Sequence, residues 1–234
     1  TSVAEHCMAL ILGICKQLLL LDSKVRNNEF KIRYQYYPQD IEGKKLGIVG
    51  FGRIGQKMAS YFYKFSSERI LAYDPIISDE GKEKFKNWVD FVDLKELLKY
   101  SDIVTIHVPL NKHTKDLISW EELKLMKAEA FIINVSRGGI INEEDLVKAL
   151  KDGIIRGAGL DVFENEPPEK DNPLLKLDNV ILTPHSAALT KECVVRMATE
   201  AASRVISVLK GYQPEMVANP EVLSHDKWKD LKSR

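Results

Sequence analysis

Three ionisable side chains in the second half of the chain have the types and spacing of a proton-transfer site. Each of them follows a predicted strand. Arg137 comes after residues 131–136, Glu166 lies in the loop after the strand that ends Gly-Leu-Asp-Val, and His185 comes directly after residues 180–184. A guanidinium can hold a carboxylate through two parallel hydrogen bonds, an imidazole can exchange a proton near neutral pH, and a neighbouring carboxylate fixes the imidazole tautomer. Beside a nicotinamide, these groups would suit oxidation of an alcohol that neighbours a carboxylate.

Each of these residues also has a structural alternative. Arg137 could be a solvated side chain in a Ser-Arg-Gly-Gly turn, Glu166 a solvated carboxylate among acids and prolines, and His185 a buried, hydrogen-bonded histidine. His107 ends another predicted strand and competes for the role of general base, although a structural hydrogen bond near a cofactor is the favoured interpretation. The catalytic hypothesis therefore depends on whether the same sheet edge binds a cofactor.

A glycine-rich stretch supplies the expected cofactor site. Residues 45–55 read Lys-Leu-Gly-Ile-Val-Gly-Phe-Gly-Arg-Ile-Gly, a short strand that runs through a turn into a helix. In this pattern Gly50 makes the turn, Gly52 lets the backbone approach a phosphate, and Gly55 allows close packing of the helix on the strand. Backbone N–H groups at the helix start face the anion, which predicts a dinucleotide pyrophosphate at this turn.

A carboxylate in the next strand narrows the choice of cofactor. Asp74 ends a second apolar run and lies 74 − 55 = 19 residues after the last glycine. An acidic side chain at this spacing meets a ribose 2′-hydroxyl. Because the same carboxylate would repel a 2′-phosphate, the sequence favours NAD over NADP.

The elements that must position these residues alternate along the chain. Alternating β-branched runs and helical patterns predict an α/β fold, a doubly wound and mostly parallel sheet with ligands at the carboxyl ends of its strands. Besides the glycine strand and the strand before Asp74, strands are expected at 88–91, 103–108, 130–135, 154–162 and 180–183. Helices are expected from the glycine turn to about Lys64, weakly at 82–87, and at 93–100, 121–127, 142–151 and 191–209.

The first helix is expected to be buried. Ser2 is the predicted N-cap, and Glu5 completes a capping box. The helix is apolar nearly all round, which favours burial between the core and another domain or subunit. Its apolar run is shorter than the roughly 20 residues that cross a bilayer, and no basic segment precedes it, so we expect neither a membrane span nor a signal peptide. Residues 22–43 lack periodicity and are expected to form a surface connection.

Composition restricts the remaining possibilities. With 234 residues and 44% hydrophobic content, the chain can build one large or two small cores. Its 34 basic and 34 acidic side chains cancel without a basic stripe, which argues against a nucleic-acid partner. The three cysteines have neither an even count nor metal-ligand spacing. They suit a reducing compartment, so we expect a cytoplasmic protein and no metal site.

Five ordered blocks resemble a known family. The blocks are Gly50-Phe-Gly-Arg-Ile-Gly55, Ser101-Asp-Ile-Val-Thr-Ile-His-Val-Pro-Leu110, Asn134-Val-Ser-Arg-Gly-Gly139, Gly159-Leu-Asp-Val-Phe-Glu-Asn-Glu-Pro-Pro168 and Thr183-Pro-His185. They look like those of the D-isomer-specific 2-hydroxyacid dehydrogenases, which include phosphoglycerate and D-lactate dehydrogenases. The resemblance extends from residue 3 to about residue 223. Formate dehydrogenases of the same fold are similar but carry Gln where Glu166 stands.

The resemblance implies an oxidoreductase that transfers a hydride between NAD(H) and a small D-2-hydroxy acid or 2-keto acid. It implies that Arg137, Glu166 and His185 are the catalytic residues. It also implies a set of NAD-binding residues, with Asp161 near the carboxamide: Gly50, Gly52, Arg53, Ile54, Gly55, Asp74, Val108, Val135, Ser136, Arg137, Asp161, His185 and Ala187.

The resemblance also bears on domain organisation. Family members carry a substrate-binding lobe before the Val-Ala-Glu helix, and most of it is expected to be absent here, which leaves the activity of this chain alone open. Residues 1–211, including the first and the long last helix, are the expected dinucleotide-binding domain, and 212–234 a remnant of the substrate domain. Ser186-Ala187-Ala188 stands where glycines are frequent, so the sequence does not choose a substrate. The family habit of pairing through the cofactor domain implies a homodimer.

Two further hypotheses stay open at this point. The chain also resembles the C-terminal-binding-protein corepressors, so it could be an NAD(H)-binding regulatory scaffold with the same fold and the same three ionisable residues. It could also be a dinucleotide-binding domain without active chemistry. A substrate panel on the complete protein, with NADH binding measured in parallel, would separate these hypotheses from a dehydrogenase.

Overall fold

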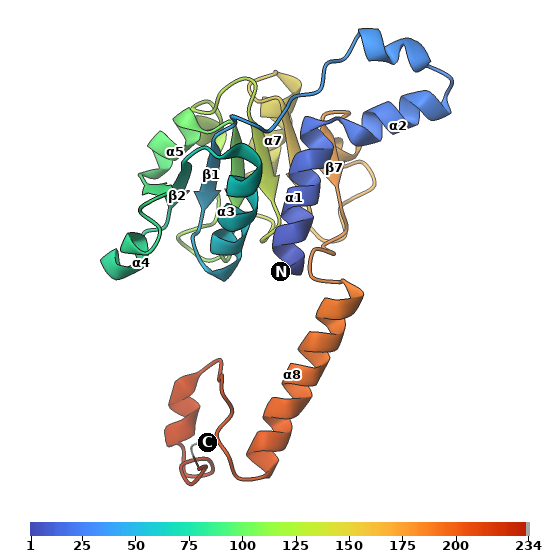
Figure 1. Ribbon diagram of the computed structural model, residues 1–234. Coiled ribbons are helices and arrows are strands. Elements are labelled where there is room, and N and C mark those ends of the chain that lie inside the picture. Colours follow the sequence, from blue (N-terminus) through green and yellow to red (C-terminus); the bar gives the residue numbers. More distant parts are fainter. Residues whose placement is uncertain (233–234) are drawn as a thin grey trace. The chain divides into compact units, whose positions relative to one another are not determined.

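Seven short strands form one parallel sheet in the computed structural model, which describes residues 1–232 (Figure 1). Their order across the sheet is β3-β2-β1-β4-β5-β6-β7. The order therefore reverses between β1 and β4, and the predicted doubly wound fold is confirmed. The strands are β1 Leu46–Val49, β2 Ile70–Tyr73, β3 Val89–Phe91, β4 Ile103–Ile106, β5 Phe131–Asn134, β6 Gly157–Leu160 and β7 Val180–Leu182.

Helices cover both faces of the sheet because the side chains of each strand alternate between two buried clusters. Leu46 and Ile48 pack into one cluster with helices α1 and α3, whereas Val49 packs into the other with α5, α6 and α7. Full burial of one such side chain stabilises the fold by about 1.5–3 kcal/mol relative to exposure. The bounds are α1 Ser2–Cys15, α3 Arg53–Ser66, α5 Leu94–Tyr100, α6 Trp120–Leu123 and α7 Glu143–Lys151.

Helix α1 is buried as predicted, but its predicted cap is wrong. Cys7, Leu10 and Ile11 are almost fully buried in the cluster that includes α3. Thr1 is the N-cap, and it acts through its backbone: its carbonyl oxygen accepts the first helical hydrogen bond, from Glu5 N–H at 3.0 Å. The helix therefore begins one residue earlier than the sequence pattern indicated, and the capping box is absent.

The segment after α1 is more regular than predicted. Residues 22–43 were expected to form a surface connection, yet helix α2 spans Leu18–Arg26 and a 3₁₀ helix, η1, spans Phe30–Tyr34. No residue of α2 is buried, so no burial periodicity could have revealed it. The helix is supported instead by a local ion pair, in which Arg26 Nε donates to Asp22 Oδ2 at 2.7 Å.

Most other boundaries differ from the predicted ones by a few residues. Helix α7 begins after its predicted cap, where the Asn142 side chain accepts from Asp145 N–H, and Gly153 with φ of 67° follows its end. The strands are shorter than the predicted ones because hydrogen-bonded pairing between neighbouring strands ends before the run of hydrophobic residues ends. The weak helix expected at 82–87 is instead α4, Asp79–Glu83, and the long loop before β7 contains a 3₁₀ helix, η2, Pro173–Lys176.

The chain divides into two compact units, Thr1–Ala187 and Ala188–Arg234. The expected domain boundary between residues 211 and 212 stays a prediction. Helix α8, Lys191–Leu209, lies in the second unit with the 3₁₀ helix η3, Pro220–Ser224. The end of α8 bonds to the tail: Ser207 O accepts from Tyr212 N–H, and Gly211 O accepts from Lys232 N–H. These contacts explain why the helix groups with the tail. Whether the tail belongs to a substrate domain stays a prediction.

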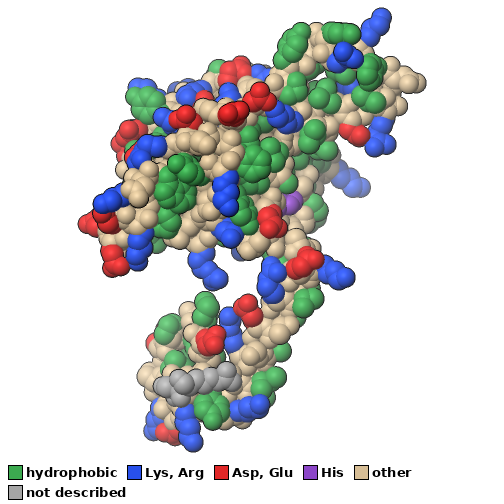
Figure 2. All heavy atoms as spheres, viewed as in Figure 1, with side chains coloured by type: hydrophobic (Ala, Val, Ile, Leu, Met, Phe, Trp, Pro, Cys, Tyr) green, Lys and Arg blue, Asp and Glu red, His purple; other side chains and the backbone are tan. Residues whose placement is uncertain are grey.

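The distribution of charged side chains and the length of the apolar helices can be followed over the described residues 1–232. Figure 2 shows basic and acidic side chains interspersed over the face in view. No single helix in this range is long and apolar enough to cross a membrane; α1 and α2 reach that length and apolarity only together, as a pair bent by 57°.

Candidate active site

The glycine turn, residues 50–55, lies at the point where the strand order reverses. β1 and β4 are neighbours, and their carboxyl ends border a crevice in sheets of this kind. Gly50 has a φ of 93°, and a Cβ on it would lie 2.7 Å from Val108. A Cβ on Gly55 would lie 2.2 Å from the carbonyl oxygen of Gly50. The turn therefore requires glycine at both positions, and Val108, one of the expected cofactor-binding residues, packs directly on it.

The start of α3 has the shape and the donors that a pyrophosphate requires. A Cβ on Gly52 would meet no atom within 4 Å, so this residue borders open space. Gly52 is also the N-cap of the 14-residue helix and supplies no side-chain acceptor to it. Arg53 and Ile54 begin the helix with exposed side chains. Unsatisfied N–H groups beside an open cradle fit a bound phosphate group.

Asp74 is fixed at the rim of this cradle. Its Oδ2 accepts from Phe51 N–H at 2.8 Å, and its Oδ1 accepts from Ile76 N–H at 3.0 Å. Both oxygens retain a lone pair for a further donor. The carboxylate is therefore tied to the glycine turn, a position that fits the predicted contact with a ribose hydroxyl.

His107 follows β4 beside the same turn, and the favoured hydrogen bond is absent. Within residues 1–232, both ring nitrogens are buried and neither has a hydrogen-bond partner. Burial lowers the pKa of His107 to about 4, so the ring is neutral at pH 7 and is poorly matched to general-base catalysis. A buried polar group without a partner costs about 1–3 kcal/mol, and such a ring, on a residue whose backbone borders Gly50, fits a site that a polar ligand completes.

Arg137 extends from a turn that Asn134 holds at the end of β5. Asn134 Oδ1 accepts from the N–H and the Oγ–H of Ser136, and its Nδ2 donates to Arg137 O at 2.9 Å. Val135 is buried, whereas the Arg137 side chain is exposed and its Nη1 donates to Ser136 O. The turn is therefore rigid while its guanidinium faces outward.

Glu166 and His185 form a pair. His185 Nδ1 lies 2.7 Å from Glu166 Oε2, and Glu166 Oε1 accepts from Phe163 N–H at 3.1 Å. Burial alone would raise the pKa of Glu166, but the hydrogen bonds from His185 and Phe163 outweigh it and lower that pKa. The carboxylate therefore stays ionised and orients the ring. A hollow of about 430 Å³ adjoins the pair, lined mostly by apolar residues such as Pro168 and Leu182.

The structure does not bring Arg137 into contact with this pair. Among residues 1–232 its guanidinium makes no ion pair. The two loops do meet, because a Cβ on Gly138 would lie 1.7 Å from the carbonyl oxygen of Phe163, at the start of the Glu166 loop. All three ionisable residues thus follow strands at the same edge of the sheet.

Asp161 organises the histidine segment, residues 183–187. It is fully buried, and its carboxylate accepts from Ser186 N–H at 2.9 Å, from Ala187 N–H at 2.8 Å and from Thr183 Oγ–H at 2.6 Å. Its own carbonyl oxygen accepts from His185 N–H at 2.7 Å. His185 has a φ of 51°, which is unfavourable for a residue with a side chain. The expected carboxamide contact of Asp161 stays a prediction; its role in holding His185 is seen directly.

Sequence reasoning missed the residues that support this geometry. Asn134 lay inside a predicted strand, Thr183 was part of a motif without a role of its own, and His6 has no partner that is visible in the sequence. In the structure His6 Nε2 lies 2.9 Å from Thr183 Oγ1. A hydroxyl two residues before the catalytic candidate was the available signal for Thr183, whereas nothing local indicated His6.

Residues 8–187 match the family model described as "D-isomer specific 2-hydroxyacid dehydrogenase, NAD binding domain". The chain belongs to this family. The D-isomer-specific 2-hydroxyacid dehydrogenase domain thus covers the sheet, the glycine turn and the histidine segment, and the cradle at Gly52 is part of an NAD-binding domain.

Two archaeal proteins are similar to this chain over most of its length. It is 43% identical to a glyoxylate reductase of Thermofilum pendens over 225 residues, which are 95% of this chain and 66% of the relative. It is 42% identical to a D-3-phosphoglycerate dehydrogenase of Methanocaldococcus jannaschii over 232 residues, 99% of this chain and 43% of the relative. The chain therefore spans only part of the length of these relatives. Both are named as enzymes, and they give the regulatory-scaffold alternative no support.

Solved structures of the family share the fold. A D-lactate dehydrogenase from Aquifex aeolicus, complexed with NAD and lactic acid, superposes with a TM-score of 0.80 at 34% identity, covering 90% of this chain and 66% of that one. An acyclic imino acid reductase in complex with NADPH and D-Arg gives a TM-score of 0.81 at 33% identity, covering 92% and 66%. Proteins with this fold therefore include one solved with NAD and one solved with NADPH.

Proposed function

We propose that the complete protein is an NAD-dependent oxidoreductase that interconverts a small D-2-hydroxy acid and the corresponding 2-keto acid. The observation that carries this proposal is the Glu166–His185 pair, 2.7 Å apart, at the carboxyl ends of the sheet whose glycine turn fits a dinucleotide. The Asp74 carboxylate at the rim of the cradle supports NAD over NADP, because a 2′-phosphate would face a negative charge.

The three catalytic candidates have separate roles in this reaction. Bound NAD would accept the hydride from the alcohol carbon. His185 would take the hydroxyl proton at Nε2, since Nδ1 is engaged by Glu166. Glu166 orients the ring through Nδ1, and the exposed Arg137 guanidinium would hold the substrate carboxylate through two hydrogen bonds. In the reverse direction His185 would return the proton to the keto oxygen.

Replacement of the general base tests the proposal. In the complete protein, His185→Asn is expected to lower kcat for reduction of a 2-keto acid by about 10²- to 10⁴-fold, because a positioned acid–base group contributes this much. His113→Asn, which changes an exposed histidine in the 111–115 loop, is the matched control and should leave kcat unchanged. Undiminished turnover in His185→Asn, measured by NADH absorbance, would sink the mechanism.

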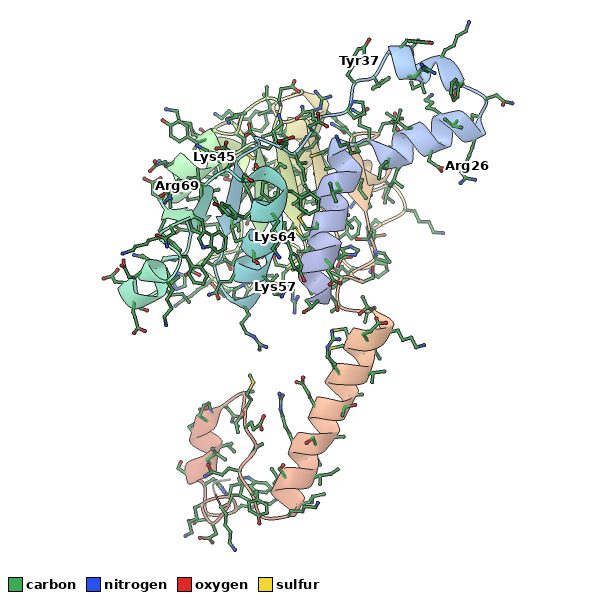
Figure 3. All side chains as sticks on the ribbon, viewed as in Figure 1. Arg26, Tyr37, Lys45, Lys57, Lys64 and Arg69 are labelled. Carbon is green, nitrogen blue, oxygen red and sulfur yellow. The ribbon has the colours of Figure 1, made fainter. Side chains whose placement is uncertain are left out.

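We further propose that the protein forms a homodimer through an arm, residues 18–37. This arm contains α2 and η1 and extends from the sheet in Figure 1, and Figure 3 labels Arg26 at the end of α2 and Tyr37 on the segment after η1. Its exposed large apolar side chains are Leu18, Leu19, Val25, Phe30, Tyr34, Tyr36 and Tyr37. So dense an apolar surface marks an interface.

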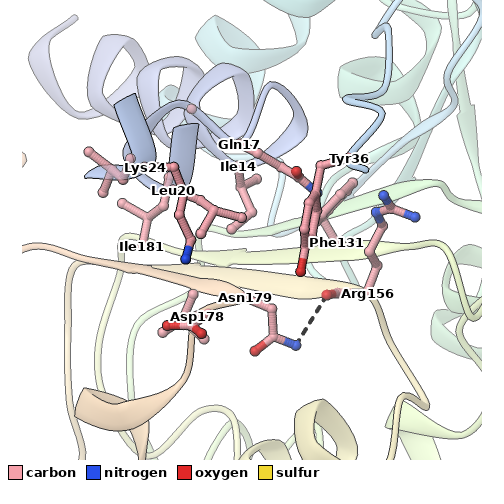
Figure 4. Close-up of a pocket in the computed structure, with 13 residues that line it drawn as sticks. Ile14, Gln17, Leu20, Lys24, Tyr36, Phe131, Arg156, Asp178, Asn179 and Ile181 are labelled. Carbon is pink, nitrogen blue, oxygen red and sulfur yellow. Dashed lines mark hydrogen bonds between the residues drawn. The ribbon is translucent and has the colours of Figure 1, made fainter. Parts of the chain in front are cut away.

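A cavity of about 270 Å³ lies at the base of the arm (Figure 4). Gln17, Lys24 and Tyr36 line it from the arm side, and Phe131 and Asn179 line it from the amino ends of the strands. It is therefore distant along the sheet from the carboxyl-end site and is available to a second copy. Sedimentation equilibrium is expected to give twice the chain mass; a monomer mass at micromolar concentration would contradict the dimer.

We also propose a cytoplasmic location. Its support is that Cys7, Cys15 and Cys193 are all free thiols, with the first two buried. Fractionation of the source cells would test the proposal, and recovery of the protein outside the cytoplasm would refute it.

A further inference from the structure

Helix α1 reaches the histidine segment through a single side chain. His6 Nε2 lies 2.9 Å from Thr183 Oγ1 and 3.5 Å from Asp161 Oδ1, although His6 and Thr183 are 177 positions apart. The His6 side chain is 24% exposed and that of Asp161 only 1%. The contact therefore joins the first turns of the N-terminal helix to a buried carboxylate behind His185.

The direction of each hydrogen bond in this contact can be deduced. Each oxygen of Asp161 accepts from a backbone N–H, Oδ1 from Ser186 and Oδ2 from Ala187, and an aspartate carboxylate has no hydrogen to donate. The single hydroxyl hydrogen of Thr183 must therefore point to Asp161 Oδ1, 2.6 Å away. It follows that Thr183 Oγ1 accepts from His6, whose proton is on Nε2.

Donation by His6 also fixes the Thr183 hydroxyl. A second acceptor, the carbonyl oxygen of Leu160, lies 3.5 Å from Thr183 Oγ1. Without a donor on its lone pairs, the hydroxyl could turn from Asp161 toward this carbonyl. With His6 in place, the chain of donors runs from His6 to Thr183 to Asp161, and Asp161 keeps all its donors.

The groups that Asp161 holds are those that determine where His185 points. Asp161 binds the backbone on both sides of the His185 side chain, at His185 N–H and at the two following N–H groups. His185 has a φ of 51°, a conformation that costs about 1–3 kcal/mol and persists only where the surroundings enforce it. Loss of one donor to Asp161 would relax this enforcement.

We propose that His6 is a positioning residue for proton transfer by His185, acting from its Nε2–H through Thr183 and Asp161. The inference rests on the proposed function for its kinetic consequence and on the hydrogen-bond geometry for its structural one. His6 touches neither substrate nor the reacting atoms in this scheme. Its effect is on the geometry of the histidine segment.

Kinetics of matched variants in the complete protein test the catalytic consequence. His6→Phe removes the donor at similar ring volume, Thr183→Val removes the hydroxyl at the same shape, and each is expected to lower kcat about tenfold with little change in KM for NADH. Because both break one chain of donors, the double variant should lose little more than either alone. His6→Gln, which keeps an N–H near the Nε2 position, should restore most of the rate. Glu5→Gln, exposed on the same helical turn, is the control.

Two spectroscopic measurements test the geometry without a substrate. Long-range ¹H–¹⁵N spectra of the 234-residue chain are expected to show neutral His6 as the Nε2–H tautomer; the Nδ1–H tautomer would overturn the proposal. Backbone hydrogen exchange at His185, Ser186 and Ala187 should be at least about tenfold faster in His6→Phe than in Glu5→Gln. If the complete protein reduces no 2-keto acid, the proposed function fails, and unchanged exchange in His6→Phe would independently refute the positioning role.

Discussion

The glycine turn acts through backbone and open space, whereas the histidine segment is held by side chains. At residues 50–55 the decisive features are missing Cβ atoms and free N–H groups at the start of α3. At residues 183–187 the decisive feature is a buried carboxylate that receives three hydrogen bonds from its neighbours. The glycines that shape the binding cradle are thus close together in the sequence. The proton-transfer group His185 instead depends on His6, Asp161 and Glu166, which lie in three separate parts of the chain.

The largest effect is expected at the histidine segment, which is held by side chains. Asp161→Asn places an amide NH₂ where an N–H of Ser186 or Ala187 now donates, so one buried donor loses its acceptor. We expect the free energy of unfolding in urea to fall by about 1–3 kcal/mol, with a loss of kcat through the displaced His185. Asp79→Asn, whose side chain is fully exposed, is the control. If Asp161→Asn has the same free energy of unfolding as the wild type, the Asp161 carboxylate does not stabilise the histidine segment.

The next experiment concerns the glycine turn and changes the pH around His107, whose backbone borders Gly50 and whose ring nitrogens are buried. Its pKa falls from 6.5 in a solvated histidine to about 4 in the fold, so below about pH 6.5 the unfolded chain binds a proton that the folded chain does not. Stability from the neutral ring is therefore present above pH 6.5 and is lost as the pH falls toward 4. Between about pH 7 and pH 5 the wild type should lose about 2 kcal/mol more than His107→Phe in urea unfolding.

The control for that experiment is His113→Phe, at an exposed site that should follow the wild type at both pH values. Parallel curves for the wild type and His107→Phe would mean that the ring is solvated or hydrogen-bonded in the folded protein. That result would remove its link to the crevice.

The smallest effect is expected at Gly52, where a loss of NADH affinity can be distinguished from a loss of folded stability. Gly52→Ala adds a Cβ that meets no protein atom within 4 Å, so its melting temperature should equal that of the wild type. The methyl group enters the phosphate space, and NADH affinity by fluorescence titration should fall about tenfold, or about 1.4 kcal/mol. Gly55→Ala, whose Cβ would lie 2.2 Å from Gly50 O, should lose folded stability as well. Wild-type affinity in Gly52→Ala would place the phosphate elsewhere.

The same comparison explains how far sequence reasoning reached. The glycine turn, Asp74 and the strand–helix alternation could be predicted because each depends on residues close in the sequence. The pairing of Glu166 with His185 could be anticipated from strand ends in a parallel sheet. Helix α2 was missed because ion pairs, not burial, support it, and the cap of α1 was misplaced because Thr1 acts through its backbone.

Other features could not be predicted because their partners are far apart in the sequence. The bond between His6 and Thr183 depends on how α1 packs on the sheet, which no local pattern encodes. The hydrogen bond expected of His107 is absent among residues 1–232, because both ring nitrogens are buried without a partner, and burial depends on long-range packing. Long-range packing, rather than residue type, decides these contacts.

The separation of 177 positions between His6 and Thr183 has a consequence for folding. A contact that closes so long a loop costs more entropy and forms late, whereas the hydrogen bonds that hold the turn between β1 and α3 are accepted by Tyr73 and Asp74, which are much nearer in the sequence. The chain should therefore acquire its dinucleotide cradle before its histidine segment is ordered. Pulsed hydrogen exchange during refolding would show the order directly, with earlier protection at 46–50 than at 185–187.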